Sequence, residues 1–113
     1  MAEQSETPKV EHSQVLRLQQ MTAYQEGSIV SRQIAKNEAG NVTLFAFDAG
    51  QQLSEHTTAF DALVQILEGE AEIRISGQAS LVRAGEAILM PANVTHALFA
   101  PVRFKMLLTM LRA

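Results

Sequence analysis

The chain has 113 residues, of which 47% are hydrophobic, and these values suit one domain with a single core. Its formal net charge is −3 and its 9 basic residues are scattered, which argues against nucleic-acid binding, because contact with the phosphate backbone needs clustered Lys and Arg. The absence of cysteine excludes disulfides and thiolate metal sites, and no apolar run approaches the ~20 residues that span a bilayer, so we expect a cytoplasmic protein without membrane contact.

The chain begins with a polar, proline-broken stretch, residues 1–12 (MAEQSETPKVEH), which shows no hydrophobic period. This composition predicts a flexible N-terminal arm. The domain itself is expected to occupy residues 13–113. Its first segment, Gln14 to Gln20, is compatible with a short strand or with one helical turn.

From Ile29 onward the pattern is typical of β-strands. Short runs rich in branched or aromatic residues occur at 29–34, 42–47, 63–67, 71–75, 87–90, 96–99 and 104–111, and glycines at 40, 50, 69, 77 and 85 separate them. Runs at this spacing, without a convincing helix among them, predict an all-β sandwich or barrel. The last run, FKMLLTML, also has helix propensity, but nothing caps it, and we therefore expect a strand.

Two stretches share one plan: Gly50 to Gly69 (GQQLSEHTTAFDALVQILEG) and Gly85 to Ala100 (GEAILMPANVTHALFA). In each, a glycine turn leads into a short β-prone run, and a histidine ends or begins an apolar run. A glycine supplies the positive φ of a tight turn at no steric cost. The histidines are His56 and His96, and their neutral imidazole nitrogens are good ligands for divalent metals.

The first stretch, residues 50–69, resembles the first motif of the cupin superfamily, which has a glycine, two histidines, a glutamate and a second glycine. Gly50, His56 and Gly69 match that motif. Thr58 stands at the position of the family's second histidine, and Ala62 stands at the position of its glutamate.

The second stretch, residues 85–100, resembles the second cupin motif. Gly85, Pro91 and His96 match it. Asn93 replaces the motif glycine, which is a mild change because Asn tolerates the left-handed region. Ala100 replaces the motif asparagine. The resemblance extends over roughly residues 40–111 and implies a double-stranded β-helix, the jelly-roll-like cupin barrel, as a single domain.

The same resemblance implies that His56 and His96 face the barrel interior, where they supply half of a metal site for Zn, Fe, Ni, Cu or Mn. The third ligand is open: it comes from Asp61, Glu55, the Thr58 hydroxyl or a bound small molecule. Asp61 has the wrong parity relative to the glutamate position, unless the preceding turn rotates it inward. Alternatively, both histidines form hydrogen bonds to each other or to water in a ligand pocket.

The expected ligand pocket comprises His56, Thr58, Phe60, Asp61 and His96. Phe60 joins it because it lies between the two motif halves. Since only two ligand positions carry a ligand residue, we favour a small-molecule-binding cupin in which no bond is changed, with or without a divalent metal. A metal-dependent enzyme of dioxygenase or isomerase type is the alternative, and a structural or sensory module is the third class.

A barrel of this size cannot direct all of its branched side chains inward, because strand residues alternate between faces. The surplus comprises Ile29, Val30, Val42, Leu44, Leu107, Leu108 and Leu111. An apolar outward sheet face normally marks an interface. We therefore expect a homodimer, with the segment from Gln14 to Gln20 near the seam.

Overall fold

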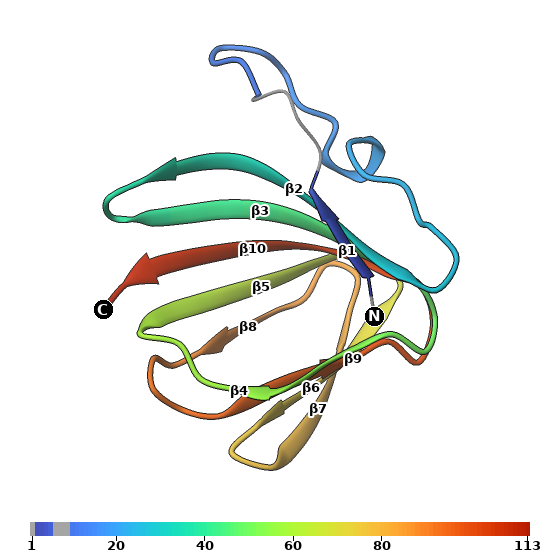
Figure 1. The fold of residues 1–113 in the computed structure, drawn as a ribbon, viewed down its shortest axis with the longest axis vertical. Helices are drawn as coiled ribbons and strands as arrows, with labels where there is room; N and C mark the ends of the chain where they lie inside the picture. Colours follow the sequence, from blue (N-terminus) through green and yellow to red (C-terminus); the bar gives the residue numbers. More distant parts are fainter. Residues whose placement is uncertain (1, 6–9) are drawn as a thin grey trace.

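The computed structural model describes residues 2–5 and 10–113 of the chain. Nearly all regular structure in this part is β, in two sheets that face each other (Figure 1). The strands are β1 (Ala2–Ser5), β2 (Ser28–Asn37), β3 (Gly40–Phe47), β4 (Gln52–His56), β5 (Phe60–Glu68), β6 (Glu70–Ile75), β7 (Gln78–Arg83), β8 (Ala87–Met90), β9 (His96–Phe99) and β10 (Phe104–Arg112). The one helical element in the described residues is η1 (Leu18–Gln20), a three-residue 3₁₀ turn that is far too short to cross a membrane.

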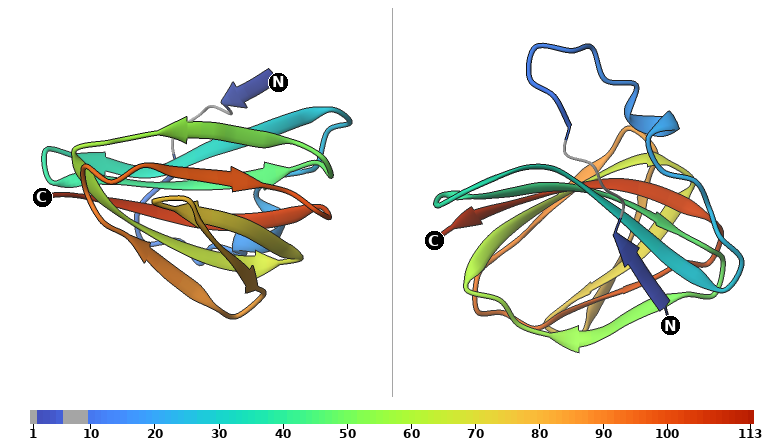
Figure 2. Two further views of the ribbon diagram at one scale, coloured as in Figure 1. Left: turned by 90° about the horizontal axis from the view of Figure 1, so that it is seen from below. Right: turned by 45° about the horizontal axis from the view of Figure 1, so that its top comes forward.

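The two sheets have the strand orders β1-β2-β3-β10-β5-β8 and β4-β9-β6-β7. Consecutive strands repeatedly cross from one sheet to the other, and apart from the parallel pair β1–β2 every pairing is antiparallel. The views in Figure 2 show the two sheets enclosing a common interior. This is the double-stranded β-helix that the two motifs predicted.

The core lies on the facing sides of the two sheets, and it is sealed at one end. Phe47 and Phe104 stack there with ring centroids 4.4 Å apart, and both are fully buried. Ala71 in β6 and Ala100, which directly follows β9, are also fully buried. Water is therefore excluded from this end of the barrel.

The opposite end of the interior is open to solvent. Phe45, Leu108 and Met110 pack against the core yet remain only partly buried. Thr43 and Asn41, which pair with Leu108 and Met110 and so share their face, are also partly exposed. We call this end the barrel mouth, and the two histidines lie at it.

Seven of the strands coincide with runs that the sequence predicted, including the last one, β10. The sequence GEA occurs at residues 69–71 and again at residues 85–87, and a strand begins within each triplet: β6 at Glu70 and β8 at Ala87. The sequence did not predict β7, whose residues QASLVR are mostly exposed and lack a hydrophobic run. Asn93 adopts a φ of 63°, as expected for a residue that replaces a motif glycine.

Of the arm expected at residues 1–12, residues 1 and 6–9 lie outside the described part of the chain, and residues 2–5 form β1 parallel to β2. The flexibility of that arm stays a prediction. The next segment contains η1, so one helical turn, and not a strand, occupies the stretch that ends at Gln20.

The segment over residues 17–27 lies against the outer face and one end of the six-stranded sheet (Figure 2). Gln19 Nε2 donates to the carbonyl oxygen of Leu67 at 2.8 Å. Gln19 in turn accepts a hydrogen bond from Lys105 Nζ at 2.5 Å through its own carbonyl oxygen. We call residues 17–27 the strap, because it ties β5 and β10 from outside.

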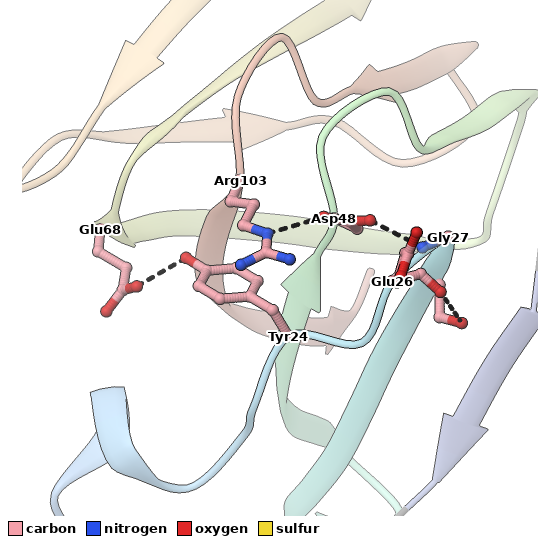
Figure 3. Close-up of polar contacts among 7 residues, drawn as sticks. Tyr24, Glu26, Gly27, Asp48, Glu68 and Arg103 are labelled. Atoms are coloured by element: carbon pink, nitrogen blue, oxygen red, sulfur yellow. Dashed lines mark hydrogen bonds and ion pairs between the residues drawn. The ribbon is translucent and has the colours of Figure 1, made fainter.

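Tyr24 anchors the strap (Figure 3). Its hydroxyl donates to Glu68 Oε2 at 2.6 Å, and the cationic groups of Arg103 and Lys105 each lie 5.1 Å from its ring centroid. Burial, the hydrogen bond to Glu68 and the charge of Glu68 raise the pKa of Tyr24 above its ordinary value. The phenol is therefore neutral and acts as the donor.

A second group of polar contacts, around Asp48, lies at the C-terminal end of the strap. Asp48 accepts hydrogen bonds from Arg103 Nε at 2.8 Å and from the backbone N–H of Gly27 at 2.7 Å. The Arg103 hydrogen bond, followed by that from Gly27, holds the pKa of the Asp48 carboxyl below its usual range. Arg103 thus links the strap to the loop after β3 (Figure 3).

Some of the surplus apolar residues face outward, as the sequence predicted. Val30 and Leu44 pair with outward residues of the six-stranded sheet, yet they are 2% and 0% exposed. The strap crosses that face, so part of the apolar surface is covered by the chain itself. Leu111 remains 52% exposed. The homodimer stays a prediction.

The first testable prediction concerns the turn between β5 and β6. Gly69 has a φ of +74°, and a Cβ built there would lie 2.0 Å from the carbonyl oxygen of Arg103. Gly69→Ala should lower the free energy of unfolding by roughly 3 kcal/mol or more, from strain and overlap together. Gly77, with a φ of +79° and open space around its Cβ position, is the matched control: Gly77→Ala should cost about 1–2 kcal/mol. Equal losses in urea denaturation would contradict the close approach at Gly69.

A second prediction concerns the strap. Tyr24→Phe keeps the ring beneath the two cations but removes the donor to Glu68, and it should lower the free energy of unfolding by about 1 kcal/mol. Tyr24→Leu removes the ring as well and should cost more. Urea denaturation measures both. If Tyr24→Phe were as stable as the wild type, the 2.6 Å hydrogen bond would not anchor the strap.

Candidate functional site

The two motif histidines meet where β4 ends and β9 begins. His56 is the last residue of β4 and His96 is the first residue of β9, and the antiparallel register places them directly opposite each other. Residues opposite each other in a sheet share a face, so both side chains lie on the interior side at the mouth. The sequence prediction that these two residues converge is confirmed in this geometry.

The two imidazole rings lie edge to face, with centroids 4.3 Å apart and an interplanar angle of 70°. His56 Nδ1 lies 2.7 Å from the carbonyl oxygen of Ser54, and His96 Nδ1 lies 3.3 Å from that of Val94. A carbonyl oxygen only accepts, so Nδ1 carries the proton in each contact. In its neutral form each ring therefore has a lone pair on Nε2, which can bind a metal or accept a hydrogen bond.

Exposure differs sharply between the two rings. His96 is 4% exposed, whereas His56 is exposed. Burial, and then the neighbouring charge of His56, lower the pKa of His96 below 6.5, although its contact with Val94 opposes the shift. His96 is therefore neutral at physiological pH.

The glutamate position of the first motif carries no ligand. Ala62 occupies it, on the inner face of β5, and is 2% exposed. Asp61 lies on the other face, in register with Leu111. Its Oδ1 accepts a hydrogen bond from the backbone N–H of Ala92 at 2.9 Å. Asp61 thus fastens the loop before His96 and does not restore a set of two histidines and one carboxylate.

Thr58, which was expected to join His56 in the ligand pocket, does not share a strand face with it, because β4 ends at His56. The alternation of side chains holds only within a strand. Thr58 Oγ1 accepts a hydrogen bond from the N–H of Phe60 at 3.3 Å, and its carbonyl oxygen accepts one from Asn93 at 2.8 Å. Thr58 therefore joins the loops of the two motifs and orders the turn into β5.

The donors present fit a metal site only in part. Two Nε2 lone pairs suit a divalent metal, and a ligating histidine usually donates its other nitrogen to a carbonyl, as both do here. Within residues 2–5 and 10–113, however, no group of three His, Cys, Asp or Glu residues could hold a metal ion. The third ligand sought at Glu55 or Asp61 is thus not in place.

A further residue at the mouth escaped the sequence analysis. Arg112 ends β10 directly opposite Phe60, and its guanidinium carbon lies 5.5 Å from the centroid of the Phe60 ring. Its Nε donates to the carbonyl oxygen of Glu38 at 2.7 Å, and its backbone N–H donates to that of Ala39 at 2.8 Å. The signal was present in the strand pattern, since Arg112 continues the inward alternation of Leu108 and Met110.

A hollow of about 490 Å³ adjoins the exposed histidine, and Gln52, Leu53, Ser54 and His56 line it. It opens to solvent along β4, an edge strand of the four-stranded sheet. Leu53 pairs with Leu98 on the interior face and packs against the core. The exposed ring is thus accessible from the mouth and from this edge.

Comparisons with known proteins agree with this architecture. The family model for the Cupin domain matches residues 43–110. A crystal structure of a conserved protein of unknown function from Streptococcus pyogenes has a TM-score of 0.86 at 36% identity, covering 92% of this chain and 91% of that chain. A cupin superfamily protein from Desulfitobacterium hafniense has a TM-score of 0.85 at 29% identity, covering 92% of this chain and 95% of that chain.

A cupin 2 conserved barrel domain protein from Leptotrichia buccalis has a TM-score of 0.83 at 35% identity over 85% of this chain. The present chain covers 47% of that protein. A comparison with curated proteins gave no match. From the matched family model, the barrel and the two motif histidines in register, the chain belongs to the cupin superfamily, as a small single-domain cupin of the cupin 2 type.

Proposed function

We propose that this protein binds a small molecule at the barrel mouth, that the His56–His96 pair anchors it, and that no bond is changed. The observation that carries the proposal is the pair of Nε2 lone pairs, left free because both Nδ1 atoms face backbone carbonyl oxygens. Two acceptors beside a partly exposed apolar wall suit a ligand with a hydroxyl or N–H donor on an apolar body.

The apolar wall comes from inward side chains that remain partly exposed. Phe45, Phe60 and Met110 are among them. A ligand that covers a partly exposed apolar side chain removes its surface from water, and this contributes favourably to the free energy of binding. The polar pair and the apolar wall together favour binding in the mouth over binding on the outer surface.

A metal-dependent enzyme finds less support in the same geometry. Catalytic metals keep three protein ligands and an open position, and here the carboxylate position is Ala62 while Asp61 is engaged with Ala92. A divalent metal at the two histidines alone would rely on the bound small molecule or water for its other ligands. We therefore propose a binding protein in which the metal is an accessory.

Phenol and anisole test the ligand site, because both carry the same ring and only phenol donates a hydrogen bond. Ligand-observed NMR should detect phenol binding to the wild type, weaker anisole binding, and loss of the phenol preference in His56→Ala and His96→Ala. His12→Ala, which removes the remaining histidine, an exposed residue that lies beside β2, is the control. Binding of phenol that survives both substitutions at the pair would refute the proposed site.

Titration with Zn²⁺ alone tests whether the His56–His96 pair binds a divalent metal. Calorimetric titration of untagged protein should show weak uptake, because the chain supplies two ligands, and uptake should disappear in His56→Ala or His96→Ala but persist in His12→Ala. If the pair were purely structural, His96→Ala would instead cost ~1–3 kcal/mol of unfolding free energy with Zn²⁺ uptake unchanged. That result would exclude the pair as a ligand site.

The lowered pKa of His96 predicts how stability varies with pH. In the unfolded chain His96 titrates near 6.5, whereas in the folded chain it stays neutral to lower pH, so the unfolded state binds more protons between the two values. The contribution of neutral His96 to the free energy of unfolding is therefore fully present above pH 6.5 and is lost as the pH falls toward the lowered pKa. Urea denaturation from about pH 7 to about pH 5 should show a shallower loss in His96→Gln than in the wild type. Identical slopes would contradict the burial of a neutral His96.

A further inference from the structure

Arg112 brings a fixed positive charge to the barrel mouth. It ends the central strand of the six-stranded sheet, and its position opposite Phe60 places it on the inward face. The C-terminus of the chain lies at the mouth end of β10 (Figure 1). Arg112 itself is exposed, so its guanidinium can reach a ligand without first losing a protein partner.

Within residues 2–5 and 10–113, no acidic side chain pairs with Arg112. Glu38 contacts it through its backbone carbonyl oxygen and not through its carboxylate. Among the residues that the structure describes, the ion pairs involve Arg74, Arg83 and Arg103, and Arg112 forms none. Only Nε is engaged, so the four N–H bonds of the two Nη atoms remain for a ligand.

The Phe60 ring holds the guanidinium in place. A cation 5.5 Å from the ring centroid is attracted by the negative face of the ring, and the hydrogen bond to Glu38 fixes the other side of the group. A planar guanidinium held in this way presents the parallel N–H donors that match a carboxylate.

Lys36 adds a second positive charge to this rim of the mouth. Lys36 pairs with Asn41 on the inward face of the β2–β3 hairpin, is exposed, and makes no ion pair within the described part of the chain. The nearby Asp61 carboxylate lies on the outer face and is bonded to Ala92. The mouth thus has a cationic rim on the six-stranded sheet, in a protein whose net charge is −3.

We propose that the ligand of this cupin is a small organic anion, a carboxylate whose charged group pairs with Arg112, whose apolar body lies along Phe60 and Met110, and whose hydroxyl or N–H points to the His56–His96 pair. This inference rests on the proposed function and adds the chemical class of the ligand. Arg112 is the residue that selects for the negative charge.

The test compares 3-hydroxybenzoate with 3-hydroxybenzamide and phenol, by NMR titration of isotope-labelled protein. All three have a ring and a donor, but only the first has a carboxylate. Wild-type protein should bind 3-hydroxybenzoate about tenfold or more tightly than the amide, because a charge-assisted bidentate contact is stronger than a neutral one. Arg112→Gln should abolish that preference, and Arg112→Lys should retain part of it.

Arg74→Gln is the matched control, since Arg74 is an exposed arginine that pairs with Glu72 on the outer face of β6. This variant should bind 3-hydroxybenzoate as the wild type does. Thermal unfolding of Arg112→Gln establishes that the variant is folded. An equal affinity of wild type for the acid and the amide, or an unchanged preference in Arg112→Gln, would overturn the anion inference.

These outcomes also separate the two proposals. If phenol binding depends on His56 but the carboxylate adds nothing, the anion inference fails and the mouth remains a ligand site. If 3-hydroxybenzoate binds through Arg112 while His56→Ala changes neither probe, the histidine anchor fails and the anion site stands.

Discussion

The register of β10 is the constraint on which the molecule depends. This strand pairs along nearly its whole length with β3 on one side and β5 on the other, so it decides which residues of three strands face inward. A slip of one residue would exchange the two faces. It would direct Lys105 and Leu107 into the core and turn Met106 outward. One irregularity is tolerated, between Lys105 and Met106, where the chain leaves the sealed end.

The same register explains how a cupin barrel can lose a carboxylate and keep its architecture. Ala62 fills the inward position of β5 as part of the core, and its small side chain leaves the histidines without a charged partner. Asp61 and Thr58 instead fasten the adjoining loops through backbone hydrogen bonds. Asp61 and Thr58 thus hold the loops, whereas His56 and His96 present two hydrogen-bond acceptors.

Most strands and both histidine positions could be predicted from the sequence because hydrophobic runs and glycine turns are local signals. The position where β4 ends could not be predicted, because it is decided by pairing with β9 and not by the residues of β4 itself. β7 was missed for a similar reason: it is mostly exposed and is held by β6. Arg112 continues the alternation of β10, but its role could not be predicted from that pattern, since the role depends on Phe60 in a different strand. The strap, too, forms through contacts between residues distant in sequence, such as Tyr24 and Glu68.

The hydrogen bonds of Arg112 to Glu38 and Ala39 have a consequence for the kinetics of binding. They join the end of β10 to the β2–β3 hairpin, so the rim of the mouth is already ordered before a ligand arrives. Little conformational entropy then remains to be lost on association. A ligand should consequently bind to a surface that is already fixed, and it should exchange fast. Differences in affinity between ligands should appear mainly in the dissociation rate.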